Sequence, residues 1–479
     1  MKKYISAFLS AVALLSLGSC DDKLDIVPKG ASTLETTEDL ELLLNHSPQL
    51  PPGISGSMGM AMYETAFLTN DYFPFYTPYT TLFNNPNSIN YAIATYDENV
   101  NRADLVTSDQ QYSALHSKIY VSNVLISKIP TSSGLESKKP QIIAEAKVRR
   151  AWYEFLLVNR FAKQYDPATA ETDGGVAYVT DTDMGTTKEK LTVAQVYEKI
   201  LEDCSDEVLA DLAQQHSDTP LRFGVDFGYG VRARVLFQMK RYDEAMEYVN
   251  KALAVNSILE DRSEIKQTLT WSYNEFNPNN YYCITCSAMT DFSMLNLTPS
   301  LIACFSPDDY IIKYAAGDYG PGYPALDDAD PYFSMPEGVK MLSVPNIFFN
   351  VWGLRTETMK YMAAEYYIKQ GDFAKGLKEL DDVQKLRIEN YEPLAPKASS
   401  MSKQEVIAEF KKAKRVEFFH SFDRYFDLKR WNSEGADWEE TLVRDYGDGQ
   451  YRLTPDSKLW IHPFPQDATN VNPTMTQNY

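Results

Sequence analysis

Two distant segments of the chain share one helix–turn–helix pattern, and this repetition constrains the fold more than any other feature. They are residues 237–246 and 367–377, and each joins two stretches of helical periodicity through a short polar turn. In each segment an aromatic residue follows the turn, and a small residue, Ala245 or Gly376, comes three positions later. A small side chain there lets the second helix lie close to the first, as in tetratricopeptide-like repeats. The sequence therefore predicts a mostly α-helical scaffold built from helix pairs, with long insertions between them.

Helical periodicity elsewhere extends this scaffold. Residues 47–110 and about 257–350 lack it and are rich in Pro, Gly, Asn and aromatic residues, so we expect mainly loops there. Long structured loops commonly carry function or cover a surface. Further helices are expected over residues 37–44 (with Thr36 or Thr37 as the N-cap), 108–129, 140–163 and 192–214.

The N-terminus has the features of a secretory signal that ends in a cysteine. Two lysines precede an apolar run of 13 residues that ends at Leu17. A run of this length is shorter than the roughly 20 residues of a membrane-spanning helix. Small residues come before Cys20, whose thiol can accept a lipid, and this pattern resembles a bacterial lipobox. We therefore expect residues 1–19 to be removed and Cys20 to carry a lipid; the alternative is an ordinary secretory signal with Cys20 there by chance.

Domain organisation follows from the same reading. Residues 20–36 are predicted to be a lipid-anchored tether, and residues 37–479 a single helical domain with the loop-rich insertion inside it. The formal net charge of -20 would repel a phosphate backbone, which argues against nucleic acid as a partner. Because no later stretch is apolar for 18 residues, the lipid on Cys20 is the membrane attachment that the sequence predicts.

Sequence motifs for catalysis or metal binding are absent. There is no HExxH, GxSxG, Walker or GxGxxG motif. Cys283 and Cys286 have CxxC spacing, but no second pair completes a zinc site, so they are buried thiols or a disulfide. Residues 181–185 resemble a calcium loop that lacks its closing acid, which predicts a solvated turn. We predict no catalytic residue, no metal and no cofactor; the histidines are scattered at His46, His116, His216, His420 and His462.

Aromatic and amide residues gather in two stretches, 71–85 and 271–282. Flat aromatic faces stack on sugar rings, while Asn, Asp and Arg side chains hydrogen-bond to hydroxyls. The alternative is that these aromatics anchor loops on the helical scaffold or contact a partner protein. The candidate ligand residues are Tyr72, Phe75, Tyr76, Tyr79, Asn85, Trp271, Tyr273, Asn279 and Tyr281.

Residues 417–431, EFFHSFDRYFDLKRW, resemble the signature helix of the SusD/RagB family of nutrient-binding surface lipoproteins from Bacteroidetes-type bacteria. Members read close to ELxxEGxRxxDLxRW; Ser421 and Phe422 depart from it, and the matching residues are Glu417, Arg424, Asp427, Leu428, Arg430 and Trp431. Periodicity alone places Trp431, Leu428, Tyr425 and Phe418 on one helix face, and Asp427 within reach of Arg424. We interpret the motif as a structural module rather than a binding site.

Other segments resemble the same family in the same order, namely 24–30, 119–126, 144–151, 192–197 and 460–478. The resemblance implies a helical protein with tetratricopeptide-like pairs, anchored in the outer membrane and facing the exterior. It also implies a SusC-like TonB-dependent transporter as the partner, and an oligosaccharide or other nutrient as the ligand. Ligand residues vary within the family, so none is carried over. Three other readings stay open: a peptide-binding member of the family, a lipid-anchored hydrolase, and a structural partner of the transporter.

Overall fold

The computed structural model describes residues 34–45, 50, 67–72, 85–271, 275–285, 296–317, 338–342, 349–445 and 449–479. The predicted signal peptide, Cys20 and most of the predicted tether lie outside these residues. Helices dominate the regular structure of the described chain, as the helix-pair pattern predicts. Among the described residues, no helix combines the length and the apolar character needed to cross a membrane.

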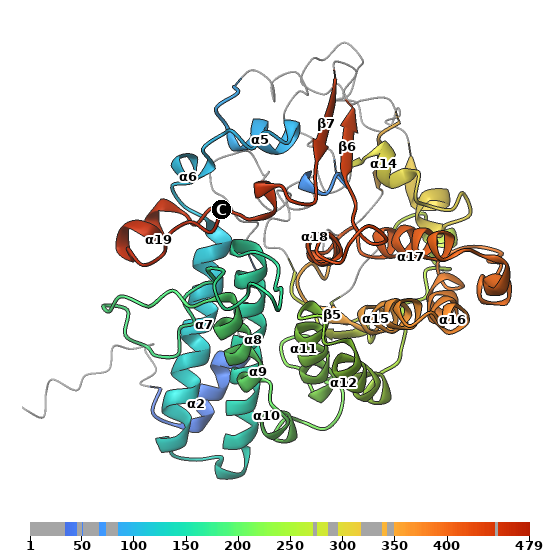
Figure 1. The fold of residues 1–479 in the computed structure, drawn as a ribbon. Helices are drawn as coiled ribbons and strands as arrows, with labels where there is room; N and C mark the ends of the chain where they lie inside the picture. The colour runs from blue at the N-terminus through green and yellow to red at the C-terminus, as the bar shows by residue number, and fades with distance from the viewer. Residues whose placement is uncertain are drawn as a thin grey trace, which may run out of the picture.

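The first group of helices confirms the expected positions with small shifts at the ends. It comprises α2 (Thr37–Glu41), α7 (Gln110–Lys128), α8 (Lys139–Phe161), α9 (Val193–Asp203) and α10 (Asp206–Ala210). α7 packs on α8 (Figure 1). α2 packs on α7, and α9 packs on α8. Thr36 is the N-cap of α2 and accepts a hydrogen bond from the Asp39 N–H at 3.1 Å. The helix expected over 192–214 is split, because Ser205 accepts the Val208 N–H and starts α10 as a separate helix.

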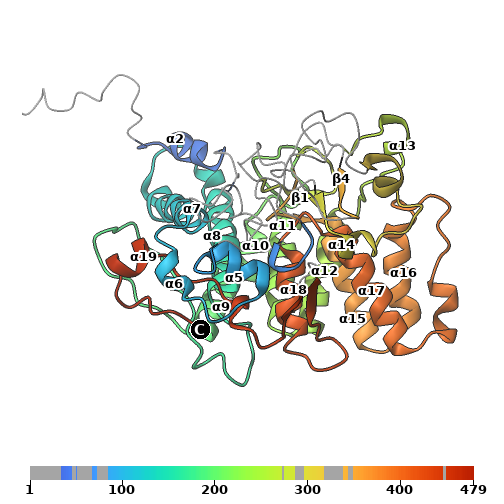
Figure 2. The same cartoon turned by 90° about the horizontal axis from the view of Figure 1, so that it is seen from above.

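The two helix–turn–helix segments form the pairs that their pattern predicts. The helices are α11 (Val225–Gln238), α12 (Tyr242–Val255), α15 (Thr356–Lys369) and α16 (Phe373–Gln384). A Cβ added at Gly376 would lie 2.6 Å from Cγ1 of Ile368 and 3.0 Å from the Ala364 carbonyl oxygen. Ala245 is fully buried in the other pair. α12 packs on α15, so the pairs are neighbours in one row of helices despite the insertion between them (Figure 2).

The family-like motif at 417–431 spans two helices rather than one, which corrects the single-helix expectation. α17 (Lys403–Glu417) ends at Glu417, and α18 (Asp423–Trp431) begins after a turn in which Ser421 Oγ accepts the Asp423 N–H. Phe418 therefore lies outside α18. The expected pair of Arg424 with Asp427 does not form: Arg424 Nη2 bonds Glu440 at 3.0 Å. Every residue of α18 is buried; its charged side chains meet partners on other segments, and Arg430 also pairs with Asp427 within the helix at 3.2 Å.

A buried charge network explains why the motif is rich in ionisable residues. Arg430 forms two hydrogen bonds to Glu365 at 2.5 and 2.8 Å, and Trp431 Nε1 donates to the same carboxylate at 2.9 Å. Lys414 Nζ lies 2.8 Å from Asp427, and these contacts join α15, α17 and α18. Burial acts to raise the pKa of Glu365, but Arg430 and Lys414 outweigh it and hold that pKa well below its usual range. The motif therefore acts as the structural module that its periodicity indicates.

Strands are short and lie mostly in the loop-rich regions. β1 (Asn280–Tyr282) pairs antiparallel with β5 (Leu354–Arg355). A three-stranded sheet has the order β2-β4-β3, formed by β2 (Asn296–Leu297), β3 (Ala316–Gly317) and β4 (Lys340–Leu342). β6 (Leu442–Asp445) and β7 (Gln450–Leu453) form a hairpin. The remaining short α-helices are α5 (Ile89–Thr95), α6 (Arg102–Leu105), α13 (Ile265–Thr268), α14 (Pro299–Ile302) and α19 (Gln466–Val471).

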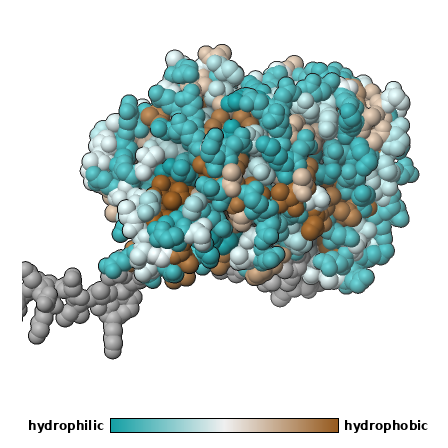
Figure 3. Space-filling view, turned by 90° about the horizontal axis from the view of Figure 1, so that it is seen from below, coloured by the Kyte–Doolittle hydropathy of each residue, from teal (hydrophilic) through white to brown (hydrophobic). Residues whose placement is uncertain are grey.

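Other helical turns are brief: 3₁₀ turns at Leu42–Asn45, Ile129–Thr131, Glu136–Lys138, Ala395–Ser400 and Lys458–Trp460, and a π-helical turn at Ile311–Ala315. One large apolar core runs through all the helix pairs, and a smaller one around Leu40 and Leu125 fixes α2 to α7 and α8. The face seen from below is mainly hydrophilic, with apolar atoms in separate patches (Figure 3). This exterior agrees with the strongly acidic composition.

Candidate functional site

The two aromatic stretches meet on one buried cluster, here called the aromatic cluster: Tyr72, Trp271, Phe349, Phe419 and His420. The Tyr72 hydroxyl hydrogen-bonds to Nδ1 of His420. The Trp271 ring lies 5.0 Å from the His420 ring and 5.6 Å from the Phe419 ring, measured between centroids. Phe419 and His420 come from the turn between α17 and α18. The structure thus brings together Tyr72 and Trp271, which composition alone could only place in separate stretches.

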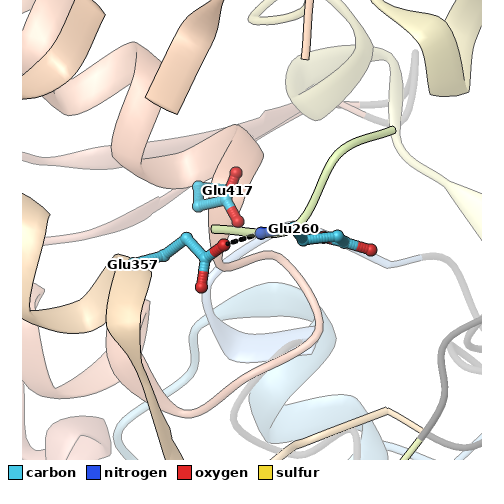
Figure 4. A group of neighbouring side chains, drawn as sticks. All are labelled: Glu260, Glu357 and Glu417. Carbon is cyan, nitrogen blue, oxygen red and sulfur yellow. Dashed lines mark hydrogen bonds between the residues drawn. The ribbon is translucent and has the colours of Figure 1, made fainter. Parts of the chain in front are cut away.

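Three carboxylates, Glu260, Glu357 and Glu417, lie next to this cluster with ligand oxygens within 4.8 Å of one another. They come from three separate segments, and the backbone N–H of Glu260 donates to Glu357 at 2.9 Å (Figure 4). Such a group can hold a metal ion in principle. Here, guanidinium groups already occupy it: Arg387 Nε lies 2.8 Å from Glu417, and Arg387 Nη2 lies 2.9 Å from Glu357.

Two more arginines complete the neutralisation of these three carboxylates. Arg262 Nη2 lies 3.0 Å from Glu417, and Arg355 Nη1 lies 3.1 Å from the same oxygen. Burial acts to raise the pKa of Glu417, but Arg262, Arg387 and Arg355 outweigh it and lower the pKa to about 2. These three acids and three arginines, here called the acid–arginine cluster, are an internal structural element and not a metal centre.

The acid–arginine cluster holds two of the predicted ligand residues from inside. Trp271 Nε1 donates to Glu260 at 3.1 Å, and the Arg262 guanidinium lies 4.8 Å from the Trp271 ring centroid. Asn279 Nδ2 donates to Glu357 at 2.9 Å. Trp271 is 4% exposed and Asn279 1% exposed. Stacking on a sugar needs a free ring face, so these contacts favour the alternative in which Trp271 anchors its loop on the scaffold.

The other predicted ligand residues divide into three groups. Tyr281 is buried on β1 and donates its hydroxyl to the Asn256 carbonyl at 2.8 Å; Tyr72 belongs to the aromatic cluster. Asn85 is exposed, and its side-chain oxygen accepts the Asn87 N–H. The predicted Phe75, Tyr76, Tyr79 and Tyr273 lie outside the described residues and stay predictions.

Phe276 is an exposed aromatic that the candidate set left out. Its side chain is 63% exposed, although it lies within the same stretch as Trp271. The signal that could have identified it is local: Phe276 follows an acid and precedes the polar turn formed by Asn277, Pro278 and Asn279.

Two small hollows flank this turn. One, of about 200 Å³, is lined by Trp271, Asn279, Asp261 and Arg262 among others. The other, of about 160 Å³, is lined by Phe276, Tyr281 and His216 among others. Carboxylate, guanidinium, amide and aromatic groups meet in these hollows, a mixture suited to hydrogen-bonding and stacking rather than to a defined chemical step.

Cysteine chemistry adds little to this face. Cys204 and Cys283 are buried free thiols, and burial raises the pKa of Cys204 to about 12. Cys286 lies outside the described residues, so its predicted relation to Cys283 stays open.

Solved structures resemble this fold over nearly its whole length. A SusD superfamily protein from Bacteroides thetaiotaomicron is 18% identical, covers 93% of this chain and 100% of its own, and gives a TM-score of 0.71. Surface glycan-binding protein A from Bacteroides uniformis is 15% identical, with coverages of 92% and 98% and a TM-score of 0.67. A SusD-like carbohydrate binding protein from Bacteroides vulgatus is 14% identical, with coverages of 93% and 98% and a TM-score of 0.66.

Sequence comparison gives the family. No curated protein matches the chain. Residues 57–236 match a family model described as "Starch-binding associating with outer membrane", and residues 359–479 match the model of the SusD family. The two matches lie in the order that the motifs indicate and together cover well over half of the chain, and the helical fold agrees with them. The chain therefore belongs to the SusD family.

Proposed function

We propose that this protein binds a glycan at the bacterial surface, is held there by a lipid on Cys20, and delivers oligosaccharide to a SusC-like TonB-dependent transporter in the outer membrane. The observation that carries the proposal is the full-length likeness to proteins described as carbohydrate-binding and surface glycan-binding. The description of the family model as starch-binding and outer-membrane-associated supports the ligand class and the location.

We place the ligand face at the two polar hollows and at the segments that continue from Tyr72 and Trp271. In this proposal Phe276 offers the exposed aromatic face, and Phe75, Tyr76, Tyr79, Asn85 and Tyr273 remain predicted contacts. The buried residues Tyr72, Trp271, Asn279 and Tyr281 support the face from beneath, because their polar atoms or rings are already engaged inside the chain.

The ligand class is tested by native gel electrophoresis of the protein without residues 1–20, in gels that contain a panel of polysaccharides. We expect retardation by at least one polysaccharide, with no release of shorter sugars on long incubation. Binding to a peptide library without any glycan retardation would favour the peptide-binding reading. Sustained hydrolysis that disappears on mutation of one carboxylate would favour the hydrolase reading.

The anchor is tested separately with Cys20→Ala. We expect the variant to incorporate no palmitate analogue and to leave the outer-membrane fraction, or to remain as an unprocessed precursor, because the thiol is the proposed lipid acceptor. Normal labelling and normal membrane fractionation of the variant would contradict the lipobox prediction.

The transporter is tested by mild detergent extraction of outer membranes from the native host, followed by affinity capture of this protein. We expect a large β-barrel receptor to co-purify in a stoichiometric amount. Isolation of this protein alone, under conditions that keep other transporter complexes intact, would contradict the delivery step and leave glycan binding untouched.

A further inference from the structure

A third, larger hollow lies along α7, away from the two small hollows. It has a volume of about 690 Å³ and is here called the α7 groove. Three segments distant in sequence form its walls: α7, residues 177–188, and the C-terminal residues 465–472. Small-molecule sites in proteins usually have volumes of about 300–1,000 Å³ and mostly apolar walls with a few polar groups. The groove meets this description, and neither the motif at residues 417–431 nor the aromatic stretches line it.

Aromatic residues line the α7 wall at helical spacing. Tyr112, His116 and Tyr120 follow one another at i, i+4 and i+8, which places them on one face of the helix. The Tyr112 ring contacts the His116 ring edge-on at 4.4 Å and the Phe161 ring at 5.2 Å, so Tyr112 is fixed from behind. Tyr120 is 37% exposed and leaves ring surface open to a ligand.

The opposite walls present single, strongly exposed apolar side chains. Met184 is 82% exposed and Val471 is 79% exposed, and both line the groove. A methionine thioether makes favourable contacts with aromatic rings, often at the ring edge. The groove therefore offers both aromatic ring surface and a thioether to a flat ring.

Charge around the groove is negative. Asp109 pairs with Arg160 at 2.7 Å, and Asp181 pairs with Lys188 at 2.7 Å, while Asp183 and Asp467 are exposed on the rim. Burial lowers the pKa of His116 to about 4, so this residue adds no positive charge at neutral pH. An anionic ligand would be repelled, whereas a neutral one would not.

The walls are fixed to one another, so the groove is formed before any ligand arrives. Asn472 Nδ2 donates to the Lys188 carbonyl at 2.8 Å, which ties the C-terminal wall to the 177–188 wall. The backbone N–H of Asp467 donates to the Thr107 carbonyl at 3.0 Å, just before α7 begins. Preformed sites spend less binding free energy on ordering.

We propose that the α7 groove is a second ligand site, which takes a neutral compound carrying a planar aromatic ring. The site is separate from the proposed glycan face, and its failure would leave the glycan proposal standing. A small ligand fits better than a second protein, because the feature is a hollow of small-molecule size with fixed walls rather than a broad apolar face.

The test uses three probes: methyl 4-hydroxybenzoate, the carboxylate anion 4-hydroxybenzoate that corresponds to the hydrolysed ester, and the saturated ring analogue methyl 4-hydroxycyclohexanecarboxylate. Protein labelled with ¹³C-methyl methionine reports binding at Met184, whose signal is assigned as the one missing from Met184→Leu. We expect the neutral aromatic ester to shift this signal in a saturable way, and the anion and the saturated analogue to bind at least several-fold more weakly.

Three variants locate the site. Tyr120→Ala should weaken the aromatic ester about fivefold, the size of loss that aromatic pair energies predict, with an unchanged thermal melt because the side chain is on the surface. Phe276→Ala, on the glycan face, should leave the ester's affinity unchanged. Asp467→Lys should strengthen binding of the anion relative to the ester, a readout that does not depend on removing an aromatic ring.

No shift of the Met184 signal at the solubility limit of the ester would overturn the proposal. Equal binding of the saturated analogue would overturn the aromatic class, and equal binding of the anion would overturn the charge argument. Sedimentation provides the remaining outcome: a wild-type dimer that Tyr120→Ala converts to a monomer would show that a second copy of the chain, and not a small ligand, occupies the groove.

Discussion

The base of the proposed glycan face consists of the aromatic cluster and the acid–arginine cluster. This base and the α7 groove both contain aromatic rings, but the rings have opposite roles. At the base, Trp271 contacts His420, Phe419 and Phe349 and bonds to Glu260, so little of its surface is left. In the groove, Tyr120 keeps more than a third of its surface exposed, and Met184 and Val471 are 82% and 79% exposed.

This difference shows that aromatic content alone does not identify a ligand site. Rings that pair with one another and with buried charges form a rigid base, whereas rings that face a hollow across from unpartnered apolar groups can receive a ligand. The predictions below separate the two roles. Changes in the aromatic cluster or the acid–arginine cluster should lower the free energy of unfolding, and changes at exposed positions should weaken ligand binding.

Removing one charge from the acid–arginine cluster should have the largest effect on the free energy of unfolding. Glu417→Gln leaves Arg262, Arg355 and Arg387 without their shared carboxylate, and breaking a buried ion pair in this way costs about 3–5 kcal/mol; we expect the upper end. Urea unfolding curves measure this change. Asp183→Asn, at an exposed carboxylate on the groove rim, is the matched control and should shift the midpoint hardly at all.

Truncating the buried Trp271 side chain should have the next largest effect on the free energy of unfolding. Trp271→Ala should lower the free energy of unfolding by about 3–5 kcal/mol, because it removes a buried ring and one of the hydrogen bonds that Glu260 accepts. Phe276→Ala in the same stretch should change it by less than about 0.5 kcal/mol. Similar losses for both variants would show that the two aromatics do not differ in role.

Low pH should destabilise the acid–arginine cluster. The pKa of Glu417 is about 2 in the folded protein and about 4.3 in an unfolded chain. A depressed pKa stabilises the fold above the unfolded value, and this stability, about 3 kcal/mol, is lost as the pH falls from about 4.5 to 2. Wild-type unfolding free energies across this range should show the loss, and Glu417→Gln should show a shallower slope. Equal slopes would contradict the assignment.

A smaller loss of stability is expected from a change within the pair formed by α15 and α16. Gly376→Ala should destabilise the protein by about 1–3 kcal/mol, because the new Cβ would lie 2.6 Å from Ile368 Cγ1 and 3.0 Å from a backbone oxygen. Gly449→Ala is the control, since a Cβ there meets no atom of the described residues within 4 Å. Thermal melting of the two variants should differ clearly; an unchanged melt for Gly376→Ala would show that the helices have room to separate.

The sequence predicts the features that depend on neighbours within one helix or turn. Gly376 and Ala245 follow from a local spacing, and the Thr36 cap from a single residue type. The break in the helix after Glu417 could not be predicted from periodicity, because α18 is buried among segments distant in sequence. Periodicity also cannot show that Arg424 bonds to Glu440 instead of Asp427. The sequence left open whether Trp271 binds ligand or anchors its loop, because its partners Glu260 and His420 are remote in sequence.

The α7 groove could not be predicted from any sequence window. Its walls come from residues 109–121, 177–188 and 465–472, and each wall alone contains only one or two exposed apolar residues of the kind that every surface shows. Only the fold brings these segments together.

The central claim is that Trp271 supports the glycan face while Phe276 contacts the ligand. Calorimetric titration with the polysaccharide that binds best in the gel panel tests it, using wild type, Phe276→Ala and Trp271→Phe alongside thermal melting. We expect Phe276→Ala to weaken binding about tenfold, near 1.4 kcal/mol, with an unchanged melting temperature. Trp271→Phe should lower the melting temperature and leave the affinity within about twofold of wild type. Weaker binding by Trp271→Phe at an unchanged melting temperature, together with unchanged binding by Phe276→Ala, would contradict the account.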